Sequence, residues 1–369
     1  MTFGEVPLVN LQKELGGNLG EFGGWVTSMD YGNPVEEHLS TRTSVSVFDV
    51  SHMGRYVVKG GDVYDFFQKA VSKDLRKFRQ GTMSGPVLLL NDAGGIKDDI
   101  MLYYLRDDEW LVVVNAPNVV KDREWLLNLK ERFGFTDIEI EDITKETVLV
   151  AIQGPKAPEV MESLGATSEV KNMKILEFIP EAEILGSQAT LISRSGWTGE
   201  EVRSYGFEVW TSIEHGAKIF REAVKAGAKP AGLIARDSLR LEMGYLLSGV
   251  DMDESTNPIE VRYWLPLTLG KTECVGCEAV MKKYEEGVEK VRIGFKLKKG
   301  DRSIPRHGNK IYAGSNEIGY VTSGVYSPML KRGIGMGYVK ATHAYVGYKL
   351  QVEIRGKLHE AKILEFPLI

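Results

Sequence analysis

Asn91–Ala116 reads NDAGGIKDDIMLYYLRDDEWLVVVNA, and this stretch decides how the central part of the chain folds. Gly94 and Gly95 predict a turn, because glycine takes positive φ at little steric cost. Two β-rich runs follow, Ile100–Leu105 and Trp110–Val114, separated by four charged residues. That pattern predicts a β-hairpin entered directly from the glycine turn.

The same turn carries two carboxylates, Asp98 and Asp99, to the start of the first strand. Neighbouring strand residues point to opposite faces of a sheet, so only one of the two can face a given pocket. An Asp pair after a Gly pair is often no more than a hydrated turn. The alternative is a catalytic carboxylate, and these residues alone leave both interpretations open.

Length and composition indicate a globular protein of two or three domains. The chain has 369 residues, of which 43% are hydrophobic and 26% charged. Lys and Arg total 46 and Asp and Glu 51, which gives a net charge of −5 without any long run of one sign. A nucleic-acid-binding protein would carry a basic face, so we expect a small-molecule ligand and no nucleic acid.

No segment indicates a membrane or a secretory route. The chain has no run of 18 apolar residues, and its start lacks the basic residues and apolar core of a signal peptide. We therefore expect a soluble, cytoplasmic protein with no membrane partner.

The chain has two cysteines, Cys274 and Cys277, in the string KTECVGCEAV. They could form a redox pair or supply half of a metal site. A structural zinc would need two further Cys or His ligands, and the six histidines are scattered without ligand spacing. We expect incidental thiols, no disulfide framework and no metal.

Asp49–Met53 lies at the entrance of an alternating run, Gly54–Lys59, that predicts a strand. His52 could act as a general base, but a single histidine among apolar residues is more often a hydrogen-bonded structural residue. Met53 is a candidate for the apolar wall of a ligand pocket, and either residue could belong to the core.

From about Lys290 the pattern changes to short alternating runs separated by glycine turns, such as KVRIGFKL, NEIGYVTSG and YKLQVEIRG. This spacing predicts a small β-barrel or sandwich as a separate C-terminal domain. Gly333–Gly337, GIGMG, lacks the full G-x-G-x-x-G pattern and precedes no helical pattern, so we expect no nucleotide site there.

No P-loop, H-E-x-x-H, G-x-S-x-G or Cys-His pair stands out in the sequence. An enzyme with this sequence would therefore depend on carboxylates and a carbon carrier more than on a protein nucleophile.

Ten strings, taken in order, resemble the glycine cleavage T-protein family, the aminomethyltransferases. Each is weak alone, but together they run from Phe22 to Pro328 with similar spacing, which makes the resemblance highly specific. The β-rich tail beyond them also resembles the family's terminal domain. The strings are FGGW, Glu37-His38 with Arg42, FDVSHMG, NDAGGIKDD, VVVNA, AIQGP, SRSGWTGE followed by GFE, GLIARDSLRLEMG, GVDMDESTNPIE and VTSGVYSP.

This resemblance implies an α+β fold with two interwoven antiparallel-sheet subdomains that form a folate channel, followed by a C-terminal β-barrel. We expect the folate-binding aminomethyltransferase region to span residues 1–285. One subdomain would combine residues 1–50 with 145–285, and the other would be residues 51–144. The barrel domain would be residues 286–369.

The resemblance also implies a tetrahydrofolate-dependent transfer. Its substrate is the aminomethyl group on the lipoyl arm of the H-protein of the glycine cleavage system. Its products are 5,10-methylenetetrahydrofolate, ammonia and the dihydrolipoyl arm. Tetrahydrofolate serves as co-substrate, with no metal and no flavin.

Three residues are carried over with roles. Glu208, in GFE, accepts the paired N–H donors of the pterin edge, much as a carboxylate accepts an Arg fork. Arg236, in ARD, is a second pocket residue that pairs with Glu208 or a pterin acceptor, and a buried structural ion pair is the alternative. Asp99 matches the family's catalytic aspartate, which orients N5 of the folate and takes its proton; Asp98 is the fallback.

Five further residues are candidates for the lining of the channel, and each could also be ordinary core: Met53, Leu88, Asn115, Trp197 and Trp264. The chain departs from the family at Trp197, where relatives usually have tyrosine, and so lacks a phenolic hydrogen bond to the ligand. Glu201–Tyr205 lengthens the turn before GFE, and Pro86 stands where relatives often have an aromatic residue. These departures bear on the identity of the donor more than on folate binding.

Three related groups are alternatives. Tetrahydrofolate-dependent demethylases move a methyl group from a small donor to folate and share the pterin site, but the sulfonium enzymes resemble this chain less around the glycine turn. Sarcosine and dimethylglycine oxidases add an FAD domain, for which no N-terminal G-x-G-x-x-G is present. Folate-binding iron-sulfur assembly factors carry K-G-C-x-x-G-Q-E, where this chain has KTECVGCE at Lys271–Glu278, with its cysteines at other positions.

Overall fold

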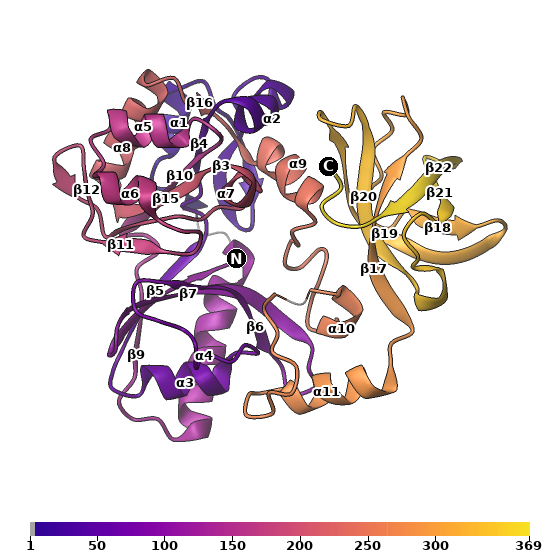
Figure 1. Ribbon diagram of the computed structural model, residues 1–369, viewed down its shortest axis with the longest axis horizontal. Helices are drawn as coiled ribbons and strands as arrows, with labels where there is room; N and C mark the ends of the chain where they lie inside the picture. Colours follow the sequence, from indigo (N-terminus) through magenta and orange to yellow (C-terminus); the bar gives the residue numbers. More distant parts are fainter. Residues whose placement is uncertain (1–3, 264) are drawn as a thin grey trace. The chain divides into compact units, whose positions relative to one another are not determined.

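The predicted hairpin forms as strands β7 (Ile96–Arg106) and β8 (Glu109–Val114), which pair antiparallel with Tyr103 opposite Leu111. The computed structural model describes residues 4–263 and 265–369 (Figure 1). The hairpin belongs to a five-stranded sheet of order β6-β7-β8-β5-β9. The other strands of this sheet are β6 (Met83–Leu90), β5 (Gly54–Lys59) and β9 (Glu139–Asp142).

Helix α3 (Val63–Ala70) packs against one face of this sheet, and α4 (Val119–Phe133) lies beside α3 (Figure 1). Phe67 of α3 stacks on Trp110 of β8, with ring centroids 5.4 Å apart. Tyr104 of β7 tilts against the same indole, with ring centroids 4.9 Å apart. These aromatic contacts bury the helix-facing side of the hairpin.

The opposite face of β7 carries Asp99, Met101 and Tyr103, because side chains alternate between the two faces of a strand. All three residues are at most 6% exposed. The Tyr103 ring lies 5.6 Å from the ring of Phe178 and 6.2 Å from that of Trp210, measured between centroids. Both partners belong to a second sheet, so this face of the hairpin packs against that sheet.

The second sheet has six strands in the order β11-β14-β15-β10-β4-β16. Neighbours pair antiparallel, except that β16 and β4 are parallel. Phe207 and Val209 of β15 enter the core with residues of α8 (Ile213–Lys225), so Glu208 and Trp210 project from the other face, toward the hairpin. The strands are β4 (Ser46–Asp49), β10 (Thr147–Gln153), β11 (Phe178–Pro180), β14 (Leu191–Ser193), β15 (Gly206–Ser212) and β16 (Lys229–Pro230).

The two sheets are interwoven along the chain. Strand β4 precedes the five-stranded sheet, whose strands lie between residues 54 and 142, and the rest of the six-stranded sheet follows from residue 147 to residue 230. The predicted α+β class, with two interwoven and largely antiparallel sheets, is therefore confirmed.

Short elements complete this part of the chain and the connection to the barrel. They are β1 (Gly4–Glu5), α1 (Val9–Glu14), β2 (Asn18–Phe22), β3 (Trp25–Asp30), α2 (Pro34–Thr43), η1 (Ala116–Asn118), α5 (Ala157–Ser163), α6 (Ser168–Asn172), β12 (Glu183–Ile184), β13 (Ser187–Gln188), α7 (Glu200–Arg203), α9 (Leu233–Met243), α10 (Pro258–Val261) and α11 (Cys277–Glu286).

The C-terminal strands form a closed barrel of order β17-β20-β19-β18-β21-β22, which confirms the predicted barrel. Alternate apolar residues such as Phe295, Val321 and Val352 fill its interior. The GIGMG string lies inside β20, where a Cβ on Gly337 would stand 2.2 Å from the Tyr320 carbonyl oxygen. The glycine therefore permits close strand approach. The barrel elements are β17 (Lys290–Leu297), β18 (Lys310–Ala313), β19 (Asn316–Ser327), β20 (Arg332–Lys340), η2 (Ala341–His343), β21 (Lys349–Ile354) and β22 (Lys357–Leu364).

The chain divides into two compact units. One comprises the residues up to Leu89 together with Asp98–Arg236, and the other comprises Leu90–Lys97 together with the residues from Asp237 onward. The domain and subdomain boundaries expected from the sequence stay predictions. Within the described ranges, no helix combines the length and apolarity needed to cross a bilayer.

Cys274 and Cys277 form a disulfide, which corrects the expectation of incidental thiols. Their Cα atoms are 5.3 Å apart, a separation that a disulfide can bridge. Gly276 between them takes a φ of 72° and is the N-cap residue of α11, which begins at Cys277. The tight turn before α11 brings the two sulfurs together. The C-x-x-C spacing alone is compatible with free thiols, a disulfide or a metal site.

A buried polar network links Arg240, near the end of α9, to the barrel. The Arg240 Nη1 donates to Asp251 Oδ2 at 2.6 Å, and its Nη2 donates to the Ser323 hydroxyl at 3.0 Å. The other Asp251 oxygen accepts hydrogen bonds from the hydroxyls of Thr322 and Ser323 at 2.5 and 2.7 Å. Asp251 is 1% exposed, so these partners balance a carboxylate that is removed from water.

Asp251→Ala is expected to lower the free energy of unfolding by about 3–5 kcal/mol, because it leaves Arg240 charged and buried without that partner. Asp237→Ala is the matched control. Asp237 contacts the same guanidinium at 2.7 Å, but its side chain is 44% exposed. The expected loss for this control is below about 1 kcal/mol. Urea denaturation followed by circular dichroism measures both variants, and equal losses would contradict the role given to Asp251.

Candidate active site

The start of β7 and the end of β8 bring Asp98, Asp99 and Asn115 together. The Asn115 side-chain amide donates to Asp98 Oδ1 and to Asp99 Oδ1, at 2.8 Å in each case. Its backbone N–H donates to Asp98 Oδ2 at 3.0 Å. Although the two aspartates are neighbours on a strand, both carboxylates reach one amide, and this cluster contains three of the residues singled out from the sequence.

Asp98 and Asp99 differ in whether a carboxylate oxygen is left to bind a ligand. Both oxygens of Asp98 accept hydrogen bonds from Asn115, and Asp98 is fully buried. Asp99 is 5% exposed, and its Oδ2 makes no hydrogen bond to any residue that the structure describes. Asp98 is thus an anchor for the hairpin, whereas Asp99 has an oxygen that can meet a ligand.

Burial and the neighbouring Asp98 raise the pKa of Asp99 well above its usual value, while the hydrogen bond from Asn115 lowers it. Both causes of the increase follow from the geometry, since burial and a nearby negative charge each disfavour ionisation. A carboxyl group raised in this way can accept and return a proton closer to neutral pH than an ordinary aspartate can.

Glu208 lies on β15 and is 4% exposed. The Ser195 hydroxyl donates to Glu208 Oε2 at 2.6 Å, and within the described part of the chain Oε1 makes no hydrogen bond. Burial raises the pKa of Glu208, and the Ser195 hydrogen bond and the charge of Arg236 lower it. The result is a buried carboxylate with one oxygen fixed and one oxygen accessible to a donor.

Arg236, in the first half of α9, contacts His52. Its Nη1 lies 3.1 Å from His52 Nε2. A guanidinium can only donate, so His52 Nε2 accepts and the imidazole is neutral with its proton on Nδ1. Burial, then Arg236 and Arg55, lower the pKa of His52 well below its usual value. His52 therefore serves as a hydrogen-bonded support for Arg236, not as a base.

Asp99 and Glu208 face the same interface between the two sheets. Tyr103 lies four residues after Asp99 on the same face of β7, and its phenol is close enough to Glu208 to be influenced by that charge. Four residues of a strand span about 13 Å. Asp99 and Tyr103 therefore lie about that far apart along one buried face, and Glu208 lies near the phenol of Tyr103.

The remaining candidates are distributed around these acids. Met53 is 6% exposed in the turn between β4 and β5, and Leu88 is fully buried in β6. Trp197 is half-buried in the turn after β14. Trp264 lies outside the described residues. The place of these four residues in a channel stays a prediction.

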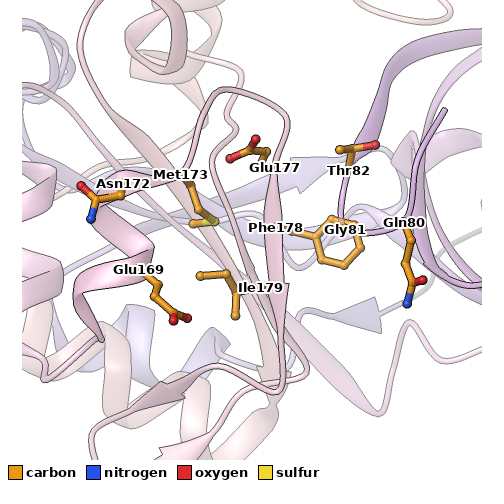
Figure 2. A pocket seen from close by; sticks show the side chains of 9 residues that line it. All are labelled: Gln80, Gly81, Thr82, Glu169, Asn172, Met173, Glu177, Phe178 and Ile179. Carbon is orange, nitrogen blue, oxygen red and sulfur yellow. The ribbon is translucent and has the colours of Figure 1, made fainter. Parts of the chain in front are cut away.

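A surface hollow of about 400 Å³ lies elsewhere, between the segment before β6 and strand β11 (Figure 2). None of the predicted site residues lines it. The lining residues are Gln80, Gly81, Thr82, Glu169, Asn172, Met173, Glu177, Phe178 and Ile179.

Sequence reasoning missed the hydroxyl groups that surround Glu208, namely those of Tyr103, Ser193 and Ser195. Tyr103 could have been found from the period of two in the hairpin, since it shares a face with Asp99. Ser195 stands inside the string SRSGWTGE, but nothing in that string shows that it reaches a carboxylate on the neighbouring strand.

Comparisons with known proteins identify the family. The family model of the GCVT N-terminal domain matches residues 8–266, and that of the glycine cleavage T-protein C-terminal barrel domain matches residues 290–369. A probable aminomethyltransferase from Aeropyrum pernix is 39% identical, with 98% of this chain and 96% of the relative covered. An aminomethyltransferase from Thermus thermophilus is 38% identical, with 99% of each covered.

Among solved structures, the glycine cleavage system aminomethyltransferase T from Bartonella henselae superposes with a TM-score of 0.90 at 30% identity. The match covers 99% of this chain and 98% of that one. Both parts of the sequence and the whole fold thus lead to one assignment. The chain belongs to the glycine cleavage T-protein family, the aminomethyltransferases.

Proposed function

We propose that the chain transfers a one-carbon unit from the aminomethyl-lipoyl arm of the H-protein to tetrahydrofolate, releasing ammonia and forming 5,10-methylenetetrahydrofolate. One observation carries the proposal: Asp99 and Glu208 project from two different sheets into one buried interface. Membership of the aminomethyltransferase family supports the reaction type. In this arrangement Glu208 could bind one end of a ligand while Asp99 lies near the part of the same ligand that reacts.

Glu208 fits the binding of a pterin edge. A carboxylate can accept two parallel N–H groups, and Glu208 Oε1 has no competing donor among the described residues. The Ser195 hydroxyl and the charge of Arg236 favour the ionised form, which has no proton to oppose a donor. Burial then strengthens a hydrogen bond made there, because the local dielectric is low.

Asp99 fits the handling of a proton. Tetrahydrofolate would supply the two N–H groups, at N5 and N10, that take up the carbon. As the carbon leaves sulfur and amine, those two protons end on the lipoyl thiol and on ammonia, so the reaction balances without an oxidant. The Oδ2 of Asp99 makes no hydrogen bond to a described residue, and the pKa of this carboxyl group is raised. Asp99 can therefore accept the N5 proton and deliver it to a leaving group.

A direct assay tests the proposal. The protein is mixed with aminomethyl-lipoyl H-protein, with and without tetrahydrofolate, and ammonia and methylenetetrahydrofolate are measured. Ammonia release is expected to rise at least about tenfold with tetrahydrofolate, with one methylenetetrahydrofolate formed per ammonia. A rate independent of tetrahydrofolate would refute the proposed transfer. Methyl transfer to folate from a small methylated donor, without ammonia, would favour the demethylase alternative.

A further inference from the structure

A chain of hydroxyl groups ends on Glu208. Ser193, the last residue of β14, pairs with Glu208 across the sheet, and Ser195 follows two residues later. The Ser193 and Ser195 oxygens are 2.7 Å apart, and the Ser195 oxygen is 2.6 Å from Glu208 Oε2. The phenol of Tyr103, from β7, lies near both serines, whose hydroxyl groups lower its pKa against the larger effects of burial and Glu208. All four residues are at most 4% exposed, so these polar groups are removed from bulk water.

The direction of the hydrogen bonds follows from the number of protons. An ionised carboxylate only accepts, so the single Ser195 proton points to Glu208. Ser195 has no further proton, and the Ser193 hydroxyl must therefore donate to Ser195. The Tyr103 phenol keeps its proton because burial and the nearby Glu208 raise its pKa well above the usual value. A neutral phenol adds no negative charge beside Glu208, and the two serine hydroxyls both donate toward that carboxylate.

Donation from Ser193 to Ser195 and from Ser195 to Glu208 requires Glu208 Oε2 to accept the last hydrogen bond. A protonated Glu208 could also accept through its carbonyl oxygen, but it would then present a hydroxyl toward the ligand. The titratable groups that face Glu208 in the described structure are Tyr103 from β7 and Arg236 from α9. Tyr103 stays neutral and Arg236 is positive, so no described neighbour adds a negative charge that would oppose ionisation.

We infer that Ser195, supported by Ser193 and Tyr103, is a positioning residue that holds Glu208 as a carboxylate with Oε1 toward the ligand. The site thereby selects a heterocycle that presents N–H donors over one that presents an acceptor at the same edge. This inference rests on the proposed function, since it concerns the same folate site. Ser195 would thus help the site to distinguish a ring edge with N–H donors from one with an acceptor, without itself touching the ligand.

Ser195→Ala is expected to raise the Kd for tetrahydrofolate about tenfold, measured by anaerobic titration calorimetry, while kcat at saturating tetrahydrofolate stays within about twofold. The reason is that Glu208 loses a charge-assisted hydrogen bond that fixes one oxygen. Ser195→Thr keeps the hydroxyl and is expected to restore the affinity to within about threefold. Ser193→Ala acts one bond further away and should raise the Kd less.

The pH dependence of binding separates positioning from simple structural support. Ser195 lowers the pKa of Glu208, so its removal should move the loss of tetrahydrofolate affinity, which occurs as the pH falls, to a higher pH. Ser46→Ala is the matched control. Ser46 is a fully buried serine on β4 of the same sheet, and its hydroxyl donates to the Glu37 carbonyl oxygen at 3.4 Å. This variant should keep the wild-type Kd and pH midpoint.

The outcomes separate the inference from the proposed function. If the wild type fails to bind tetrahydrofolate, the proposed function itself is wrong. If the wild type binds and turns over, but Ser195→Ala has the same Kd and the same pH midpoint, the function stands and the role of Ser195 is refuted. A higher Kd that Ser195→Thr does not restore would also refute it, because the effect would then come from side-chain packing.

Discussion

Asp99→Asn is expected to bind tetrahydrofolate with nearly wild-type affinity and to lose about 10²–10⁴-fold in kcat for ammonia release, the range that a positioned general base contributes. Asparagine keeps the size of the side chain and an oxygen that can accept from the Asn115 amide, which lies 2.8 Å from Asp99 Oδ1. It cannot take up a proton. Single-turnover assays with aminomethyl-lipoyl H-protein measure the rate, and calorimetry measures the affinity.

The same substitution should stabilise the protein at neutral pH. The folded-state pKa of Asp99 is raised above the unfolded value, so the folded state binds more protons between those two pKa values. Stability therefore falls as the pH rises through that interval, and an ionised Asp99 costs stability above it. Asn removes this cost, and we expect a higher Tm at pH 7 with no difference from the wild type at a pH below both pKa values.

Asp108→Asn is the control, because Asp108 is an exposed residue in the turn of the same hairpin and should leave rate and Tm unchanged. Equal turnover by the wild type and Asp99→Asn would remove Asp99 from the mechanism. A fall in Tm at pH 7 would show that its carboxylate stabilises the hairpin in the way that Asp98 does.

The sequence predicts the hairpin well because its determinants are local. Gly94 and Gly95 end the turn that leads into β7, and the alternation after them places Asp99 on one face of that strand. Much of the barrel is predictable for the same reason, since short turns join β18 to β19, β19 to β20 and β21 to β22. The pairing of β4 with β10 is different, because it joins residues about 100 positions apart and has no local signal.

The candidate site divides in the same way. Resemblance to the family supplied Glu208 and Arg236 by position, but not the hydrogen bonds that determine their charge. Ser195 reaches Glu208 only because β14 and β15 are neighbours in the sheet. The place of Asn115 in a channel stays a prediction, and its amide joins two carboxylates that alternation alone would separate. The pairing of strands that are distant in sequence thus determines the hydrogen bonds and the charge of these acids, which local sequence patterns do not predict.

Glu208→Gln is expected to raise the Kd for tetrahydrofolate about 10²-fold, equivalent to about 2.7 kcal/mol. A hydrogen bond to a charged group contributes roughly 1.5–3 kcal/mol, and an amide replaces one of the two acceptor oxygens with a donor. If the amide nitrogen faces the pterin edge, donor meets donor; if it faces Ser195, it disrupts the directed hydroxyl chain. Either orientation leaves a buried polar group without its partner.

The kcat of Glu208→Gln at saturating tetrahydrofolate should stay within about fivefold of the wild type, because Asp99 and its contacts are unchanged. Glu183→Gln, an exposed carboxylate on β12, is the control for loss of one negative charge. The two acids therefore have opposite expected signatures: substitution of Glu208 changes Kd, and substitution of Asp99 changes kcat. If Glu208→Gln kept its affinity and lost turnover instead, Glu208 would be the residue nearer the reacting carbon, and the assignment of the two acids would have to be exchanged.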